Sequence, residues 1–281
     1  MHFTQYIKGH LALARVSNSP TVLTNVLAGA ALAGTLWHAH LAVVAVAMVL
    51  FYTAGMYLND VFDVAVDRAQ RPERPLPAGA VTLRCALLVA ILLLLAGLAL
   101  LASVSPAVLS GGLVLASVIT VYDAWHKSNP VAPVLMASTR GLVYVIAYLA
   151  VQPAVSLTLA WAVIIVFCYV MGLTSIAASE TRQSFTGRWP VLCLFAPIVY
   201  FAWTLPLGWQ WGLVALFALW VTWSIRLVYQ GSIPTGITQL IAGIALVDAL
   251  ILAAAGEAVG CAVALVAFAL TLLLQRFVKG T

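Results

Sequence analysis

The feature that most constrains this chain is a series of long apolar segments that occupy most of its 281 residues. A helix needs about 20 apolar residues to cross the hydrocarbon core of a bilayer, with a usable range of about 17–25. Ten segments fit that template, near residues 20–36, 41–59, 84–103, 106–122, 131–150, 156–178, 190–206, 209–229, 236–255 and 258–275. The sequence therefore predicts an all-α, polytopic membrane bundle of nine to ten transmembrane helices, forming a single domain over residues 1–281.

Composition excludes the other common classes of protein. Hydrophobic residues make up 64% of the chain and charged residues only 7%, whereas soluble domains are about half apolar and about a quarter charged. The four cysteines show no CxxC spacing, so neither a zinc site nor a disulfide framework is indicated. The net charge of +5 is better explained by one face of a membrane protein than by a nucleic-acid surface. We expect a lipid bilayer as partner and no nucleic acid.

The basic residues orient the predicted bundle. They precede the first segment or follow an even-numbered one, and the opposite connections carry none. By the positive-inside rule this basic side is cytoplasmic, so both termini are expected in the cytoplasm. The expected location is a bacterial-type inner or plasma membrane. The residues on this side are Lys8, Arg15, Arg68, Arg71, Arg74, Arg84, Lys127, Arg182, Arg188, Arg226, Arg276 and Lys279. Arg140 is the exception, because it lies within the fifth segment, where a charge is costly and indicates function.

Acidic residues are concentrated where the second segment ends. Four of the chain's eight lie between positions 60 and 73. On a helix, residues spaced by three, four and seven share a face, so the first of them form one polar stripe. Crowded carboxylates need a cation, and hard oxygen ligands favour Mg²⁺ shared with substrate phosphates. Arginines follow directly, which is the layout for a metal-bridged diphosphate. The alternative is a solvated helix end with ordinary salt bridges. The stripe consists of Asn59, Asp60, Asp63 and Asp67, and the arginines are Arg68, Arg71 and Arg74.

These residues carry a family resemblance. The pattern Asn59-Asp60-x-x-Asp63-x-x-x-Asp67, followed by Arg74-Pro75-Leu76-Pro77-Ala78-Gly79, resembles the first signature of the UbiA superfamily of intramembrane prenyltransferases. That signature reads NDxxDxxxD and then an RPLPxG-like turn. The stretch from Tyr122 to Lys127 resembles the family's YDxxxK element. The resemblance covers most of the chain, and its tenth segment and altered second motif resemble the divergent EboC group.

The resemblance implies a bundle around a central cavity with its active site at the cytoplasmic mouth. A prenyl diphosphate would bind through Mg²⁺ and ionise, and its carbocation would attack a small lipophilic acceptor, aromatic or cyclic. The implied catalytic residues are Asp60, Asp63, Asp67, Tyr122 and Lys127. The implied substrate-binding residues are Asn59, Arg68, Arg71, Arg74, Asp123, Lys127, Arg140, Arg182 and Gln183, and the implied metal ligands are Asn59, Asp60, Asp63, Asp67 and Glu180. The rival hypothesis is a non-catalytic protein of the same fold that binds or transports an isoprenoid.

The family's second motif departs from its usual form. Ser179 and Gln183 stand where the family has aspartates, and Glu180 is the only acid nearby. The second metal subsite is therefore either reduced to one carboxylate or built from neutral oxygens. Arg182 or Arg188 could instead clamp phosphate, and Glu180 with Arg182 could form a surface pair at a helix end.

Four further polar residues have open roles. Asp123 and Lys127 are four apart and are therefore expected on one helical face, where they either serve metal and diphosphate or form an ion pair. Asp248, deep in the ninth segment, could bind the acceptor, stay protonated or hydrogen-bond a neighbouring helix. His126 lies near the expected mouth and is a candidate for proton handling.

Overall fold

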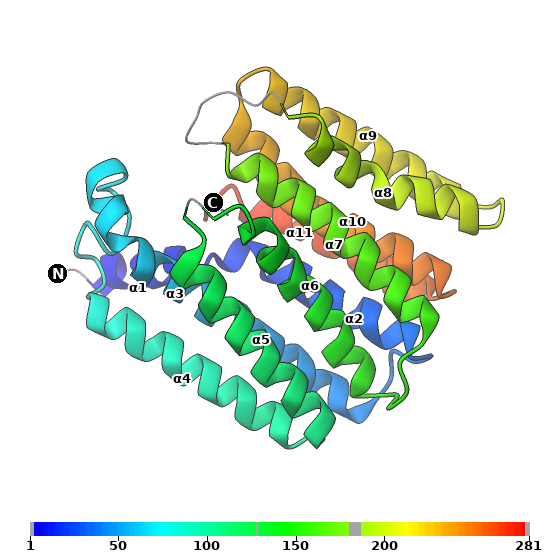
Figure 1. Ribbon diagram of the computed structural model, residues 1–281, viewed down its shortest axis with the longest axis horizontal. Coiled ribbons are helices and arrows are strands. Elements are labelled where there is room, and N and C mark those ends of the chain that lie inside the picture. Colours follow the sequence, from blue (N-terminus) through cyan, green and yellow to red (C-terminus); the bar gives the residue numbers. More distant parts are fainter. Residues whose placement is uncertain (1–2, 128, 180–186, 279–281) are drawn as a thin grey trace.

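A computed structural model describes residues 3–127, 129–179 and 187–278, and helices are the only regular secondary structure within these residues. Most helices run side by side as one bundle (Figure 1). The α-helices are α1 (Phe3–Leu13), α2 (Ser19–Leu32), α3 (Ala39–Gln70), α4 (Leu83–Ala102), α5 (Pro106–Trp125), α6 (Ala132–Leu149), α7 (Leu157–Ala177), α8 (Trp189–Thr204), α9 (Gln210–Tyr229), α10 (Ile233–Ala254) and α11 (Ala258–Leu274), and a 3-10 helix, η1 (Val16–Asn18), links α1 to α2.

Each of the ten predicted segments corresponds to one of these helices. In the described part of the chain, α3, α4, α5, α6, α7, α9 and α10 are long and apolar enough to cross a membrane, and α8 and α11 are shorter apolar helices. The first predicted segment, α2, has only 14 helical residues. Helix α1 was not expected, because polar residues interrupt its 11 residues and prevent a long apolar run. The prediction of an all-α membrane bundle is confirmed.

Helix α3 is longer than a bilayer crossing requires. Its 32 residues span about 48 Å at 1.5 Å per residue, against a hydrocarbon core of about 30 Å. The extra turns at its carboxyl end carry Asp60, Asp63 and Asp67, so the acids are helical and lie beyond the most apolar part of the helix. The sequence 71–82 then turns the chain back into α4, where the Thr82 side chain accepts a hydrogen bond from the backbone of Cys85.

The core is organised in two halves that share α2 and α6. One hydrophobic cluster is built mainly by α7 to α11 and the other mainly by α3, α4 and α5, and residues of α2 and α6 contribute to both. The two shared helices approach closely, because a side chain at Gly29 of α2 would meet the backbone of Tyr144 on α6. Helix α10 is the most enclosed, and every residue from 242 to 253 is buried. Polar side chains on these three helices are therefore held in a fixed, water-poor interior.

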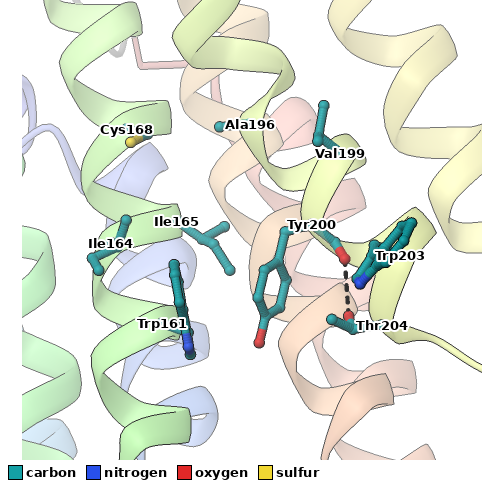
Figure 2. Close-up of a pocket in the computed structure, with 9 residues that line it drawn as sticks. All are labelled: Trp161, Ile164, Ile165, Cys168, Ala196, Val199, Tyr200, Trp203 and Thr204. Atoms are coloured by element: carbon teal, nitrogen blue, oxygen red, sulfur yellow. Dashed lines mark hydrogen bonds between the residues drawn. The ribbon is translucent and has the colours of Figure 1, made fainter.

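Two hollows lie at the end of the bundle opposite the acids. One, of about 660 Å³, lies between α7 and α8 and is lined by apolar and aromatic side chains (Figure 2). Trp161 and Tyr200 face each other across it with ring centroids 5.9 Å apart. The second shares Ile165 and Tyr200 with the first and extends inward to α2 and α10.

Candidate active site

The carboxyl end of α3 holds two buried aspartates that face arginines. Asp60 and Asp67 are each 5% exposed. Arg15 Nη2 lies 3.0 Å from Asp60 Oδ1, and Arg74 Nη1 lies 2.9 Å from Asp67 Oδ2 and 3.8 Å from Asp60 Oδ1. Arg15, which precedes α2, and Arg74, which follows α3, therefore balance the negative charges of Asp60 and Asp67.

Arg15 takes an unusual backbone conformation. Its φ of 42° and ψ of 47° lie in the left-handed region, which costs a non-glycine residue backbone energy. Two contacts hold it there: its side chain donates to Asp60, and its carbonyl accepts a hydrogen bond of 3.0 Å from the Tyr52 hydroxyl. The junction between α1 and η1 is thus fixed so that the guanidinium points at the acids.

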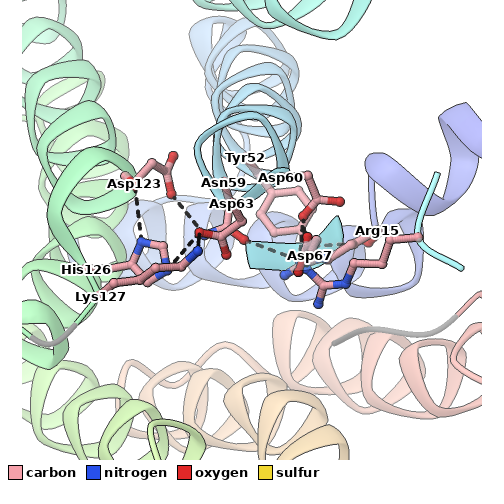
Figure 3. Close-up of polar contacts among 10 residues, drawn as sticks. Arg15, Tyr52, Asn59, Asp60, Asp63, Asp67, Asp123, His126 and Lys127 are labelled. Atoms are coloured by element: carbon pink, nitrogen blue, oxygen red, sulfur yellow. Dashed lines mark hydrogen bonds and ion pairs between the residues drawn. The ribbon is translucent and has the colours of Figure 1, made fainter. Parts of the chain in front are cut away.

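The neighbouring face of α3 meets the end of α5. Lys127 Nζ lies 2.6 Å and His126 Nε2 lies 3.5 Å from Asp63 Oδ1, and Asn59 Nδ2 donates to Asp123 Oδ1 at 3.4 Å (Figure 3). The expectation that Asp123 and Lys127 share a helical face is wrong, because α5 ends at Trp125 and Lys127 turns toward α3 instead. The structure thus brings together Asn59 and Asp63 with the predicted residues of α5.

His126 is the titratable group at this junction. The Asp63 carboxylate, as a hydrogen-bond partner, raises the pKa of His126 above its usual value, although partial burial opposes the shift. The ring also stacks on Tyr122, with centroids 5.3 Å apart. The Asp63 carboxylate therefore favours the positively charged form of the His126 imidazole.

The oxygen atoms of this site suit Mg²⁺. In the described ranges, no three histidine, cysteine or carboxylate side chains converge as a preformed metal centre. Mg²⁺ does not need one, because it keeps several waters and uses one or two carboxylates plus substrate phosphates. Asp123 Oδ2 is among the buried side-chain atoms that have no hydrogen-bond partner in the described residues. A buried carboxylate oxygen left without a donor, beside Asn59 and Asp63, fits a cation ligand.

The remaining predicted residues are placed as follows. Arg68 is exposed on α3. Arg71 caps the same helix, and its backbone N–H bonds the carbonyl of Asp67 at 2.8 Å. The predictions for Glu180, Arg182 and Gln183 concern residues that lie outside the described ranges.

Arg140 lies deeper, in a buried polar network that we call the core network: Thr24, Asn25, Arg140, Tyr144 and Asp248. Arg140 Nη1 donates to Asn25 Oδ1 at 2.8 Å. Asp248 accepts from Thr24, Asn25 and Tyr144, so of its three possible roles the structure shows hydrogen bonding to neighbouring helices. Thr24 and Tyr144 were not predicted. The available signal was spacing, because Tyr144 lies one helical turn after Arg140.

Three comparisons place this geometry among known proteins. A family model described as the UbiA prenyltransferase family matches residues 22–184, more than half of the chain. Digeranylgeranylglyceryl phosphate synthase of Methanoregula boonei is 38% identical over 125 residues, which are 44% of this chain and 44% of that protein. The chain thus aligns with less than half the length of that curated relative.

Solved structures extend the likeness to the whole fold. A UbiA homologue from Archaeoglobus fulgidus matches with a TM-score of 0.62 and 16% identity, over 90% of this chain and 99% of that one. The structure of a homologue from the same organism, described as bound to GPP and Mg²⁺, matches with a TM-score of 0.56 and 14% identity, over 95% of this chain and 99% of that one.

Proposed function

We propose that this chain, which belongs to the UbiA prenyltransferase family, is a membrane enzyme that moves a prenyl group from a prenyl diphosphate to a glyceryl phosphate lipid. The observation that carries the proposal is the meeting of carboxylates and cations from α1, α3 and α5 at one end of the bundle. Opposite charges packed in this way bind a diphosphate through metal and arginine together.

The residues divide into two roles. Asn59, Asp63, Asp67 and Asp123 would hold Mg²⁺, which when bound supplies charge neutralisation to the diphosphate leaving group. The A. fulgidus homologue described as bound to GPP and Mg²⁺ supports the choice of metal. Arg74 exchanges its carboxylate partner for phosphate oxygens, Arg15 keeps its ion pair with Asp60 and donates its other N–H groups to phosphate, and Lys127 steadies the departing diphosphate.

The transfer breaks the bond between the prenyl C1 and the diphosphate oxygen and forms a bond between C1 and the acceptor oxygen. The hydroxyl proton is released with the diphosphate. Positive charge develops at the allylic carbon, and an aromatic face such as that of Tyr122 stabilises it while excluding water. Asp60 positions Arg15 by their 3.0 Å ion pair.

The relatives support one class of acceptor. The M. boonei protein is named for a digeranylgeranylglyceryl phosphate product, so an acceptor already carrying one geranylgeranyl chain on glyceryl phosphate fits best. The aromatic or cyclic acceptor that the family resemblance suggested has no support from these names. The EboC-like branch stays a prediction.

The membrane arrangement supports a cytoplasmic site. The protein is an integral, multi-pass membrane protein. We propose a single domain over residues 1–281, with the acids and both termini on the cytoplasmic side, because the basic connections are all on that side.

The test is product formation by the purified protein in lipid nanodiscs. Geranylgeranyl diphosphate, Mg²⁺ and geranylgeranylglyceryl phosphate should give free diphosphate and a doubly prenylated lipid by mass spectrometry. Asp63→Asn should lower the rate by about 100-fold or more, whereas Glu257→Gln, at the opposite end of the bundle, should not. Binding of the diphosphate with no release, whichever acceptor is supplied, would instead establish the rival hypothesis of a non-catalytic isoprenoid-binding protein.

A further inference from the structure

We propose that Arg140 binds the acid group of the acceptor, and that Asp248 is a positioning residue that aims Arg140 through Asn25. The inference rests on the proposed function, because it assigns the acceptor's subsite in that reaction. It concerns the core network, which lies apart from the acids of α3.

Asp248 is saturated by neutral donors. Its carboxylate is fully buried on α10. Thr24 Oγ1 donates to Oδ2 at 2.5 Å, and Asn25 Nδ2 lies 2.9 Å from Oδ1 and 2.8 Å from Oδ2. Tyr144 donates a further hydrogen bond to Oδ1. A carboxylate accepts about four hydrogen bonds, so Asp248 is satisfied without contacting Arg140.

Asn25 links Asp248 to Arg140 by hydrogen bonds to both side chains. An amide has one donor end and one acceptor end. The donor end faces Asp248, and the acceptor oxygen takes a 2.8 Å hydrogen bond from Arg140 Nη1. Because an aspartate on one side accepts only and an arginine on the other donates only, the amide has one stable orientation. Asp248 thereby fixes the direction of the Arg140 guanidinium across three helices, α10, α2 and α6.

Arg140 has N–H groups that lack a hydrogen-bond partner among the described residues. A guanidinium has five N–H groups, and one hydrogen bond from it is found among the described residues. No carboxylate of those residues lies within 4 Å of it, although its cation lies 5.9 Å from the centre of the Tyr52 ring. The side chain is half-buried, not sealed. A cation in the membrane interior with free donors and no direct counter-ion is suited to bind an anion, and its planar fork matches phosphate or carboxylate oxygens.

The position of Arg140 suits the second substrate of a transfer. Tyr52 lies seven residues before Asn59 on α3, which places it two turns, or about 10 Å, deeper than the acidic stripe. Two anionic substrates repel each other in a low-dielectric site. A separate cation at this depth holds the acid of the acceptor away from the diphosphate while the reacting carbon and oxygen lie between them.

The test separates the Michaelis constants of the two substrates. With geranylgeranylglyceryl phosphate as acceptor, Arg140→Gln should raise the acceptor KM by about 10- to 100-fold, and Asp248→Asn should raise it less. The KM for geranylgeranyl diphosphate should stay within about twofold in both variants. Arg140→Lys keeps the charge and should recover part of the affinity. Ser224→Ala, which removes a buried hydroxyl outside the core network, should change neither constant.

A comparison of acceptors identifies the acid group that Arg140 binds. Geranylgeranylglyceryl phosphate should react well and its dephosphorylated alcohol poorly, and this preference should disappear in Arg140→Gln. If 4-hydroxybenzoate is the acceptor used and its KM depends on Arg140, the acid is a carboxylate and the subsite stands. Equal KM values for the phosphate and the alcohol, or an unchanged acceptor KM in Arg140→Gln, overturn the inference while product formation upholds the proposed function. If no acceptor releases diphosphate, the proposed function fails, and acceptor binding to wild type and Arg140→Gln then decides this inference in the same way.

Discussion

Gly29→Ala tests the close approach of α2 and α6 that brings Asn25 to Arg140. A methyl group at Gly29 would lie 2.6 Å from the carbonyl oxygen of Tyr144, 2.9 Å from Cβ of Ala147 and 3.0 Å from Cα of Tyr144. Two of these atoms are backbone atoms that cannot rotate away. The helices must therefore separate by at least about 0.4 Å before the variant can pack.

The expected cost follows from that overlap. Overpacking of a rigid interior costs about 1–3 kcal/mol, and alanine recovers about 0.5–1 kcal/mol because it favours the helix over glycine. Because the methyl group overlaps backbone atoms, the upper part of the overpacking range applies and the net loss should be about 1–2 kcal/mol, roughly a 5- to 30-fold change in the folding equilibrium constant. Gly212→Ala is the matched control, because Gly212 lies in α9 and a methyl group there meets nothing within 4 Å. It should be neutral or stabilise by about 0.5–1 kcal/mol.

Unfolding in mixed micelles of rising SDS content, followed by tryptophan fluorescence, measures both variants on one scale. Gly29→Ala should unfold at lower SDS than wild type, and Gly212→Ala at equal or higher SDS. If Gly29→Ala is as stable as Gly212→Ala, the close contact between α2 and α6 does not exist in the protein and the reasoning is refuted.

Three further outcomes are expected. Chelation of divalent ions by EDTA should abolish diphosphate release and added Mg²⁺ should restore it, and release that persists in EDTA would exclude the metal role of Asp63. In the metal-free protein, NMR should show that the His126 imidazole has a pKa above 6.5, because the Asp63 carboxylate favours its charged form. The stability that this interaction adds is fully present below the pKa of His126 in the unfolded chain and is lost as pH rises through its pKa in the folded protein. Asp63→Asn removes the carboxylate charge and should return the His126 pKa toward its ordinary value. An unchanged His126 pKa in that variant would count against the contact between His126 and Asp63. Phe51→Ala should destabilise the bundle by about 3–5 kcal/mol in SDS titration, because Phe51 is 1% exposed and packs against Gly97, and a loss below 1 kcal/mol would contradict that packing.

Hydropathy predicted where the chain crosses the membrane, because length and apolar content alone decide that question. It could not predict which way each helix faces. Asn25 and Asp248 are 223 residues apart, and nothing local indicates that they are hydrogen-bonded. The end of α5 was missed for another reason: no glycine or proline marks Trp125 as its last residue, so Lys127 was expected to continue the helix. The acidic stripe was predictable because its spacing itself encodes one helical face.

The span of chain between Thr24 and Asp248 also sets an order of events during synthesis. At about 5–20 residues per second, α10 follows α2 out of the ribosome by roughly 10–45 s. Helix α6 is made before α10, so Asn25 can accept its hydrogen bond from Arg140 before Asp248 exists. Afterwards α11 anchors the start of α2 through a 3.0 Å hydrogen bond from Gln275 to Asn18. A nascent chain that stops short of α10 leaves Arg140 and Asn25 without the aspartate that balances them, which gives membrane quality control a recognisable signature of incompleteness.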